Sequence, residues 1–309
     1  MKRILDCRAS NFRQMGREEL KGAILAAEGR TVMAETVVVS QPLLPEITNA
    51  ELAKAFGADL ILLNVFDVFQ PEVRGIVPFD IFNPDSGAGT VSNPIAEIKR
   101  LTGLPVGINL EPVDASADAV ESLNVLPEGR RATAGSLARA KELGCDFVCL
   151  TGNPKTGVTN AQILQAISTA QEHFGGLIIA GKMHGAGTRG SVIDREAAVS
   201  FAEAGADIVL FPAPGTVPGL REEELAGIIA EVKEKGALAL AAIGTSQEGA
   251  DEGTVRMIAL SAKRAGADIL HIGDAGYSGM ANPENIMALS IAIRGRRHTY
   301  IRMAASPLR

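Results

Sequence analysis

The chain has 309 residues and a net charge of −6, with 46% hydrophobic residues, 4% aromatic residues and no Trp. This length is sufficient for one large domain or two small ones with a substantial core, which Ala, Leu, Ile and Val must build because aromatics are few. The acidic balance excludes a general nucleic-acid-binding surface, although a local site can still bind a small anionic metabolite.

Apolar periodicity predicts strands and helices that alternate along the chain. Residues 1–16 show no clear period, and two irregular connections cover 67–92 and 112–131. The first connection is long enough to suggest a functional excursion over a site. The predicted strands cover 31–39, 59–64, 104–112, 146–152, 177–183, 206–214, 237–245 and 267–274. The predicted helices cover 17–29, 48–57, 93–103, 133–144, 158–175, 194–205, 221–236, 250–266 and 282–295, and a basic tail covers 296–309.

A recurring junction organises these elements. A small helix end leads through Ala-Asp or Cys-Asp into an apolar run in FGADLILL, LGCDFVCL, AGADIVLF and AGADILHI. Near-continuous apolar strands are typical of parallel sheets that are covered on both faces. Eight strand–helix units predict one α/β domain over 1–309, a single (β/α)8 TIM barrel with an N-terminal extension and extra helix in 1–30. A doubly wound open sheet is the alternative, and the absence of GxGxxG after the first strand weakens it.

In such a barrel the carboxyl ends of all strands meet at one rim, which holds the active site. The fifth strand ends in GKMHGAG, so Lys182 and His184 lie at this rim, two residues apart, and point to the same side if the chain is extended. Lys182 can form a Schiff base or act as an ammonium that stabilises an anion. His184 can act as a general acid or base. Glu35 and Glu111, at the first and third strands, complete the predicted catalytic set.

Further rim residues suit substrate and metal binding. Glu35, Glu111 and His184 are candidate ligands for a divalent metal, although no cofactor is certain from the sequence. The glycine-rich loops after the last two strands resemble places where barrels bind phosphate, but Glu248 and other nearby acids oppose an anion there. His271 lies within a strand and is interpreted as a core histidine. The predicted substrate-binding residues are Asn64, Asn109, Thr151, Asn153, Gly244, Thr245, Ser246, Gly273 and Asp274.

The order of segments ADLILLNVFD, PVGINLEP, LTGNPKTGVTN, IIAGKMH and ADIVLFPAPGT resembles the BtpA family of barrel proteins. That family has a strand ending on Asn, a PVGVN-like strand, a TG…VTDQG-like loop and a strand ending in Lys and His residues. The resemblance spans roughly 50–275 at the level of strand pattern. The loops after the second and third strands differ, so the resemblance implies an uncharacterised bacterial TIM-barrel protein related to phosphate-binding barrels, without implying a reaction.

The sequence therefore predicts a cytoplasmic enzyme that acts on a small phosphorylated or carboxylated metabolite by lyase, aldolase or isomerase chemistry. A metal-assisted hydrolase and a non-catalytic metabolite-binding or assembly protein remain open alternatives. No signal peptide or membrane-spanning run is recognisable, and neither a membrane nor a nucleic-acid partner is predicted. Cys7, Cys145 and Cys149 lack metal-ligand spacing and are expected to be buried thiols. Association into a homo-oligomer through the N-terminal helices and basic tail is a further prediction.

Overall fold

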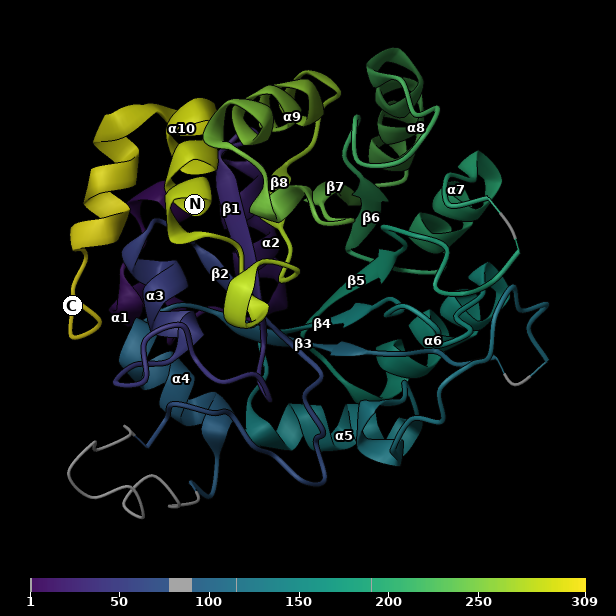
Figure 1. Cartoon of the computed structure of the whole chain (residues 1–309), viewed down its shortest axis with the longest axis horizontal. Helices are drawn as coiled ribbons and strands as arrows, with labels where there is room; N and C mark the ends of the chain where they lie inside the picture. The colour runs from purple at the N-terminus through teal and green to yellow at the C-terminus, as the bar shows by residue number, and fades with distance from the viewer. Residues whose placement is uncertain (1, 78–90, 115, 190) are drawn as a thin grey trace.

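A computed structural model describes residues 2–77, 91–114, 116–189 and 191–309 as a closed barrel of eight parallel strands in sequential order (Figure 1). The strands are β1 (Thr31–Val37), β2 (Leu60–Asn64), β3 (Val106–Leu110), β4 (Phe147–Leu150), β5 (Leu177–Gly181), β6 (Ile208–Pro212), β7 (Leu238–Ile243) and β8 (Ile269–Ile272). Every strand pairs with its neighbours in sequence, and β8 closes the ring on β1. The predicted (β/α)8 barrel is confirmed.

A helix follows each strand and covers the outside of the barrel (Figure 1). In chain order these helices are α3 (Asn49–Ala55), α4 (Pro94–Thr102), α5 (Ala134–Leu143), α6 (Asn160–His173), α7 (Arg195–Glu203), α8 (Glu222–Glu234), α9 (Glu252–Arg264) and α10 (Pro283–Ala304). The segment before the barrel contains η1 (Ile4–Asp6), α1 (Ala9–Phe12) and α2 (Arg17–Leu25), and the loops contain η3 (Glu128–Arg130), η4 (Gln247–Gly249) and η5 (Tyr277–Gly279). Part of the long connection predicted over 67–92, namely 78–90, lies outside the described residues.

The repeated Ala-Asp or Cys-Asp junction has a structural purpose at the amino-terminal rim of the barrel. Each aspartate precedes an even-numbered strand, and its carboxylate accepts a hydrogen bond of 2.8 or 2.9 Å from a backbone N–H at the start of the strand before it. The backbone N–H of the same aspartate donates to the carbonyl of that partner residue. The pairs are Asp59 with Val32, Asp146 with Val106, Asp207 with Ile178 and Asp268 with Ala239. These bonds fix the register of neighbouring strands at their first residues.

The carboxyl-terminal segment 296–309, predicted as a tail, is helical up to Ala304. Helix α10 continues to Ala304 after a break at Gly295, where φ is +75°. Its second half carries Arg302, whose Nε lies 2.7 Å from Oδ1 of Asp59, while Arg294 pairs with the other carboxylate oxygen. Asp59 is fully buried. This buried ion cluster ties the end of the chain to the start of β2.

The strand register divides the barrel mouth into a polar half and an apolar half. Registered partners in a parallel sheet face the same side, so the pairing of Glu35 with Leu62 and of Asn109 with Cys149 defines the inner positions. The inner side chains near the carboxyl ends of β8 and β1 to β4 are His271, Glu35, Asn64, Asn109, Glu111 and Thr151. Those of β5 to β7 are Ile179, Gly181, Leu210, Pro212 and Ala242. Polar chemistry is thus confined to one side of the mouth.

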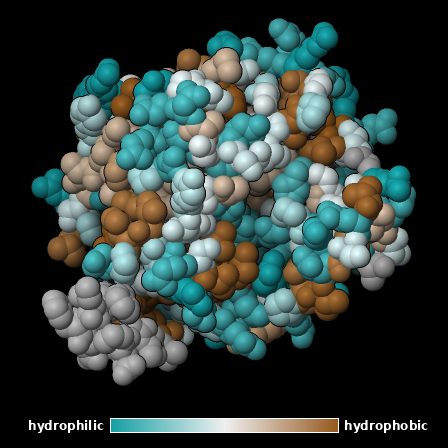
Figure 2. All heavy atoms as spheres, in the orientation of Figure 1, coloured by the Kyte–Doolittle hydropathy of each residue, from teal (hydrophilic) through white to brown (hydrophobic). Residues whose placement is uncertain are grey.

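The surface offers scattered apolar side chains. Figure 2 shows hydrophobic residues as several separate patches among hydrophilic ones on the face in view. Large hydrophobic side chains that are exposed near the strand-end loops are Val39, Leu44, Phe69 and Tyr277. Association into a homo-oligomer stays a prediction. Cys7, Cys145 and Cys149 are buried free thiols, as expected, and none of the described helices is long and apolar enough to cross a membrane.

Candidate active site

Glu35 and Asn109 form the centre of a buried polar network in the barrel mouth. Nδ2 of Asn109 donates to Oε1 of Glu35 at 2.6 Å and to Oδ1 of Asn64 at 3.0 Å. All three side chains are 4% exposed and come from three consecutive strands. The sequence predicted that these strand ends converge, and the structure brings them into direct contact.

Asn64 connects this centre to the loops after β4 and β8. Its Nδ2 donates to Oδ1 of Asn153 and to Oδ2 of Asp274, both at 2.8 Å. Its Oδ1 accepts from the backbone N–H of Val65 at 2.8 Å. Val65 has φ +61°, a conformation that is strained for a β-branched residue. Strain of this kind is concentrated at functional sites, and here it holds the Asn64 side chain in the network.

Glu111 has a full set of protein partners. Its Oε1 accepts from Nη2 of Arg130 at 2.5 Å and from Nδ2 of Asn153 at 3.1 Å, and its Oε2 accepts from the Asn153 backbone N–H at 3.1 Å. The Glu111 side chain is 2% exposed. Because its charge is balanced and its oxygens are occupied, Glu111 is better suited to hold Asn153 and Arg130 in place than to react.

His271 is a member of the site that sequence reasoning assigned to the core. Its imidazole is fully buried, and Nε2 lies 3.1 Å from Oε2 of Glu35 without the alignment of a hydrogen bond. Among the described residues neither ring nitrogen has a hydrogen-bond partner. The strand register identifies His271 as an inner residue. His271 pairs with Met33, which faces the barrel interior, and the next inner residue of β1 is Glu35.

The surroundings of Asp274 favour its protonated form. Burial, together with the negative charges of Glu35 and Glu248, raises the pKa of Asp274 to about 8, although the hydrogen bond from Asn64 acts in the opposite direction. Asp274 therefore carries a proton at neutral pH. With Oδ2 accepting from Asn64, the other oxygen is free to carry that proton and to donate it.

The loops after β7 and β8 do not form an open cradle for an anion. Glu248 is 2% exposed, and its Oε1 accepts from the backbone N–H of Ala275 at 3.0 Å, so a carboxyl group already occupies an amide that a phosphate would use. Burial raises the pKa of Glu248. Thr245 and Ser246 are exposed, and the Thr245 hydroxyl donates to the Thr216 carbonyl at 2.5 Å. A phosphate pocket that includes Gly244 and Gly273 stays a prediction that this geometry does not favour.

Lys182 is buried away from the two acids with which the sequence grouped it. Strand β5 ends at Gly181, and Lys182 lines a small cavity with Asp194, Phe201 and Phe211, between the outer face of the barrel and α7. Burial lowers the pKa of Lys182, and Asp194 partly opposes this effect. The side chain has no hydrogen bond or ion pair with the described residues, and the structure does not bring it to Glu35 or Glu111.

The side chains of His184 and Lys182 do not point to the same side, because the chain bends after β5 ends at Gly181. Its Nδ1 accepts from the backbone N–H of Ala186 at 3.0 Å, so the neutral imidazole carries its proton on Nε2. Burial lowers the pKa of His184, while the charges of Glu35 and Glu111 raise it less strongly. The imidazole is therefore a neutral N–H donor within the electrostatic range of the acidic network.

The described side chains do not converge on a metal. No three His, Cys, Asp or Glu residues among them lie close enough together to hold an ion. Of the candidate ligands, Glu111 is bonded to Arg130, Glu35 to Asn109, and His184 uses Nδ1 for a backbone amide. A divalent metal held by these three residues stays a prediction, and each of the three already uses at least one potential ligand atom for a protein partner.

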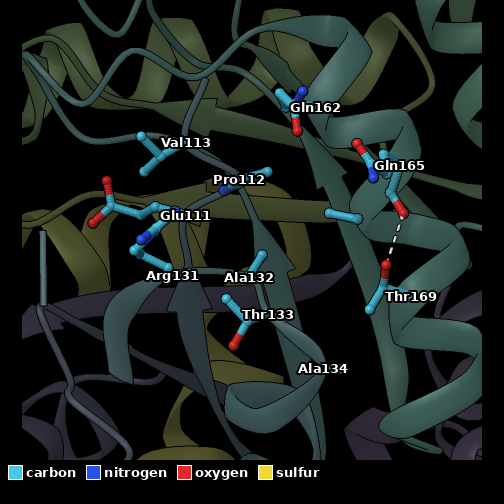
Figure 3. A pocket seen from close by; sticks show the side chains of 11 residues that line it. Glu111, Pro112, Val113, Arg131, Ala132, Thr133, Ala134, Gln162, Gln165 and Thr169 are labelled. Atoms are coloured by element: carbon cyan, nitrogen blue, oxygen red, sulfur yellow. Dashed lines mark hydrogen bonds between the residues drawn. The ribbon is translucent and has the colours of Figure 1, made fainter. Parts of the chain in front are cut away.

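A separate pocket of about 260 Å³ lies outside the barrel interior, between the segment before α5 and the side of α6 (Figure 3). Glu111, Thr133, Gln162 and Gln165 contribute to its lining. In Figure 3 the carboxylate of Glu111 points away from the two glutamines. The pocket therefore shares one residue with the mouth network but receives none of its reactive groups.

Comparisons with known proteins show the fold and the family. Among solved structures, 2,3-dimethylmalate lyase, described as a member of the PEP mutase/isocitrate lyase superfamily, is 14% identical with a TM-score of 0.48, covering 86% of this chain and 81% of that one. The carboxyl transferase domain of Rhizobium etli pyruvate carboxylase is 12% identical with a TM-score of 0.50, covering 96% of this chain and about half, 51%, of the other. Thiamine phosphate pyrophosphorylase from Pyrococcus furiosus is 14% identical with a TM-score of 0.46, covering 87% and 97%.

A likeness at these identities concerns the fold alone, and the barrel is shown by the closed ring of eight strands. No curated protein matches the chain. The resemblance to the BtpA family stays a prediction, because the family model that matches is a different one, described as "Domain of unknown function (DUF7916)", and it covers residues 5–309. Since this match spans nearly the whole sequence, the chain belongs to the DUF7916 family.

Proposed function

We propose that the barrel mouth catalyses proton transfer at a carbon next to a carbonyl group, as part of a lyase or isomerase reaction on a small metabolite. One observation carries this proposal: Glu35 and Asp274 are joined through Asn64 and Asn109, and burial, together with the negative charge of Glu35, raises the pKa of Asp274 to about 8. A carboxyl group with a raised pKa in the same network as a second carboxyl group is a usual basis for separate acid and base roles.

In this proposal Glu35 removes the proton from carbon, and Asp274 donates a proton to the carbonyl oxygen or the leaving group. His271 lies next to the base, with Nε2 3.1 Å from Oε2 of Glu35. The Nε2–H of His184 is a further donor for the oxygen on which negative charge develops. Asn109, buried beside Glu35, positions the base rather than reacting itself.

The position of Lys182 supports one of the reaction types suggested by the sequence over another. Its amine is directed into the cavity beside α7, so proton transfer by carboxyl groups is better supported than a Schiff base at Lys182. The predicted phosphate or carboxylate group of the substrate lacks a cation to bind it. Arg130 pairs with Glu111, and no other positively charged side chain among the described residues lies beside Glu35. Neither the hydrolase nor the non-catalytic alternative gains a specific observation.

Hydrogen–deuterium exchange tests the proposal without knowledge of the full reaction. The protein is incubated in D₂O with a panel of small ketones, 2-oxo acids and hydroxy acids, and mass spectrometry detects incorporation of deuterium at carbon. We expect at least one compound to exchange, with a loss of about 100-fold or more in Glu35→Gln. Asp274→Asn keeps an acceptor for Asn64 but cannot transfer a proton, and should also be slow.

The exposed residue Glu128 provides the matched control, since Glu128→Gln makes the same chemical change outside the network. Exchange that is equally fast in Glu35→Gln and Glu128→Gln would remove Glu35 from the mechanism. A folded protein that exchanges no member of the panel would favour the non-catalytic alternative.

A further inference from the structure

Buried polar atoms without partners gather at the proposed active site. Eight such atoms occur among the described residues, and five of them belong to four residues of the barrel mouth. These five are Asn109 Oδ1, Thr151 Oγ1, Glu248 Oε2 and both ring nitrogens of His271. Each of the four residues is 4% exposed or less. Buried polar groups are normally hydrogen-bonded, so this concentration marks a place where a ligand supplies the missing partners.

The unpaired atoms are of both kinds, acceptors and donors. Oδ1 of Asn109 can only accept, whereas the Thr151 hydroxyl and the His271 ring can donate or accept. Because burial raises the pKa of Glu248, that carboxyl can also donate when it is protonated. A ligand group that matches this set must donate and accept at the same time. A hydroxyl group does both, while an ammonium only donates and a carboxylate or phosphate dianion only accepts.

The charges around these atoms oppose an anion. Burial, and in addition the negative charges of Glu35 and Glu248, raise the pKa of Asp274, so this site already disfavours a further negative charge. Arg130 is committed to Glu111, and Lys182 faces α7. An anionic group that entered the mouth would therefore meet Glu35 without a compensating cation among the described residues, in an environment where charge repulsion is only weakly screened.

The opposite side of the barrel mouth is apolar, so a ligand that fills the mouth must present C–H groups to it. Inner positions of β5 to β7 carry Ile179, Leu210, Pro212 and Ala242, which offer no hydrogen bonds from their side chains. A ligand that fits both halves has hydroxyl groups along one edge and C–H groups on the other face. Carbohydrate-like molecules have this arrangement.

We propose that the substrate class of this site is a neutral hydroxy-carbonyl compound, such as a short sugar, whose hydroxyl groups bind to Asn109, Thr151 and His271. This inference rests on the proposed function, because it concerns the same site. It differs from the sequence-based prediction of a phosphorylated or carboxylated substrate in that the part of the substrate bound in the barrel mouth is neutral. The apolar side formed by β5 to β7 receives the C–H face of the molecule.

Three ketones of equal carbon number separate the charge classes: dihydroxyacetone is neutral, pyruvate is an anion and aminoacetone is a cation. Ligand-observed NMR and calorimetry on the full chain give their dissociation constants. We expect dihydroxyacetone to bind most tightly and Thr151→Val to weaken it about tenfold, the effect of one lost hydrogen bond in a buried site. Because the Thr151 hydroxyl has no partner in the described part of the protein, this substitution should leave the fold intact.

Thr36→Val is the matched control. Thr36 is 3% exposed, but the alternation of β1 directs it away from the barrel interior, next to the inward-facing Glu35. Tighter binding of pyruvate or aminoacetone, absence of dihydroxyacetone binding, or equal effects of the two valine substitutions would each overturn the proposal.

The two proposals can fail separately. Binding of dihydroxyacetone with no deuterium exchange in any compound would retain the ligand class and remove the reaction. Deuterium exchange in pyruvate alone, lost in Glu35→Gln, would retain the reaction and remove the ligand class.

Discussion

Replacing Asp274 by Asn should stabilise the protein at neutral and alkaline pH. The carboxyl has a pKa of about 8 in the folded protein and about 4 in an unfolded chain. Between these values the folded state binds a proton that the unfolded state does not, so the free energy of unfolding of the wild type falls as pH rises through this window. Asn keeps an oxygen that accepts from Asn64 and has no proton to lose.

The size of the effect follows from the same difference. Each pH unit in the window changes the free energy of unfolding by about 1.4 kcal/mol, which gives an upper limit of about 6 kcal/mol for the whole shift. Because solvent reaches part of the Asp274 side chain, we expect roughly 2–3 kcal/mol of this between pH 5 and 8. Urea-unfolding midpoints of wild type and Asp274→Asn, measured from about pH 5 to 9, should diverge as pH rises.

The exposed Asp118 is the control, because Asp118→Asn removes a carboxylate that has only a solvent-screened partner, Arg189. Its stability curve should run parallel to that of the wild type. If Asp274→Asn also runs parallel, Asp274 is ionised at neutral pH, and the division of acid and base roles between Asp274 and Glu35 is wrong.

Three further substitutions test other parts of the account. Lys182→Met should leave deuterium exchange intact, and borohydride with a ketone should not label Lys182; a specific label there would restore the Schiff-base mechanism. Asp59→Asn leaves two buried arginines without their carboxylate, so it should lower the free energy of unfolding in urea by about 3–5 kcal/mol. Asp146→Asn is the control and should have a smaller effect, because Asp146 pairs with a single, more exposed lysine. Similar losses would mean that burial of the cluster is unimportant. Glu111→Gln should lower the unfolding midpoint, and adding Arg130→Met should restore part of it; additive losses would argue against a coupled pair.

The fold could be predicted because it repeats. Four Asp-led junctions, continuous apolar strands and glycine helix ends recur along the chain, and any one of them supports the interpretation of the others. The function of the aspartates in holding neighbouring strands was not predictable, since it depends on which backbone amides lie across the rim. The helix over 296–304 escaped prediction because Gly295 and a run of arginines interrupt the apolar pattern, although Arg302 is buried by its ion pair with Asp59.

The site could be predicted only where a strand end determined it. Glu35, Asn64 and Asn109 were identified because each lies at or near the carboxyl end of a strand. His271 was missed because a single strand does not reveal which of its faces is the inner one, and this requires the register with β1. Lys182 was grouped with the acids because it follows the fifth strand at the same rim, but β5 ends at Gly181 and Lys182 keeps the outward direction of Ala180.

Asp274 is protonated at neutral pH within the hydrogen-bonded network that also contains Glu35. Carbon-13 NMR of the protein labelled at the aspartate carboxyl carbon tests it most directly, with Asp274→Asn identifying the resonance. We expect a resonance that titrates near pH 8 and disappears in Asp274→Asn. Titration near pH 4, the ordinary value of about 3.9 for an aspartate, would contradict it.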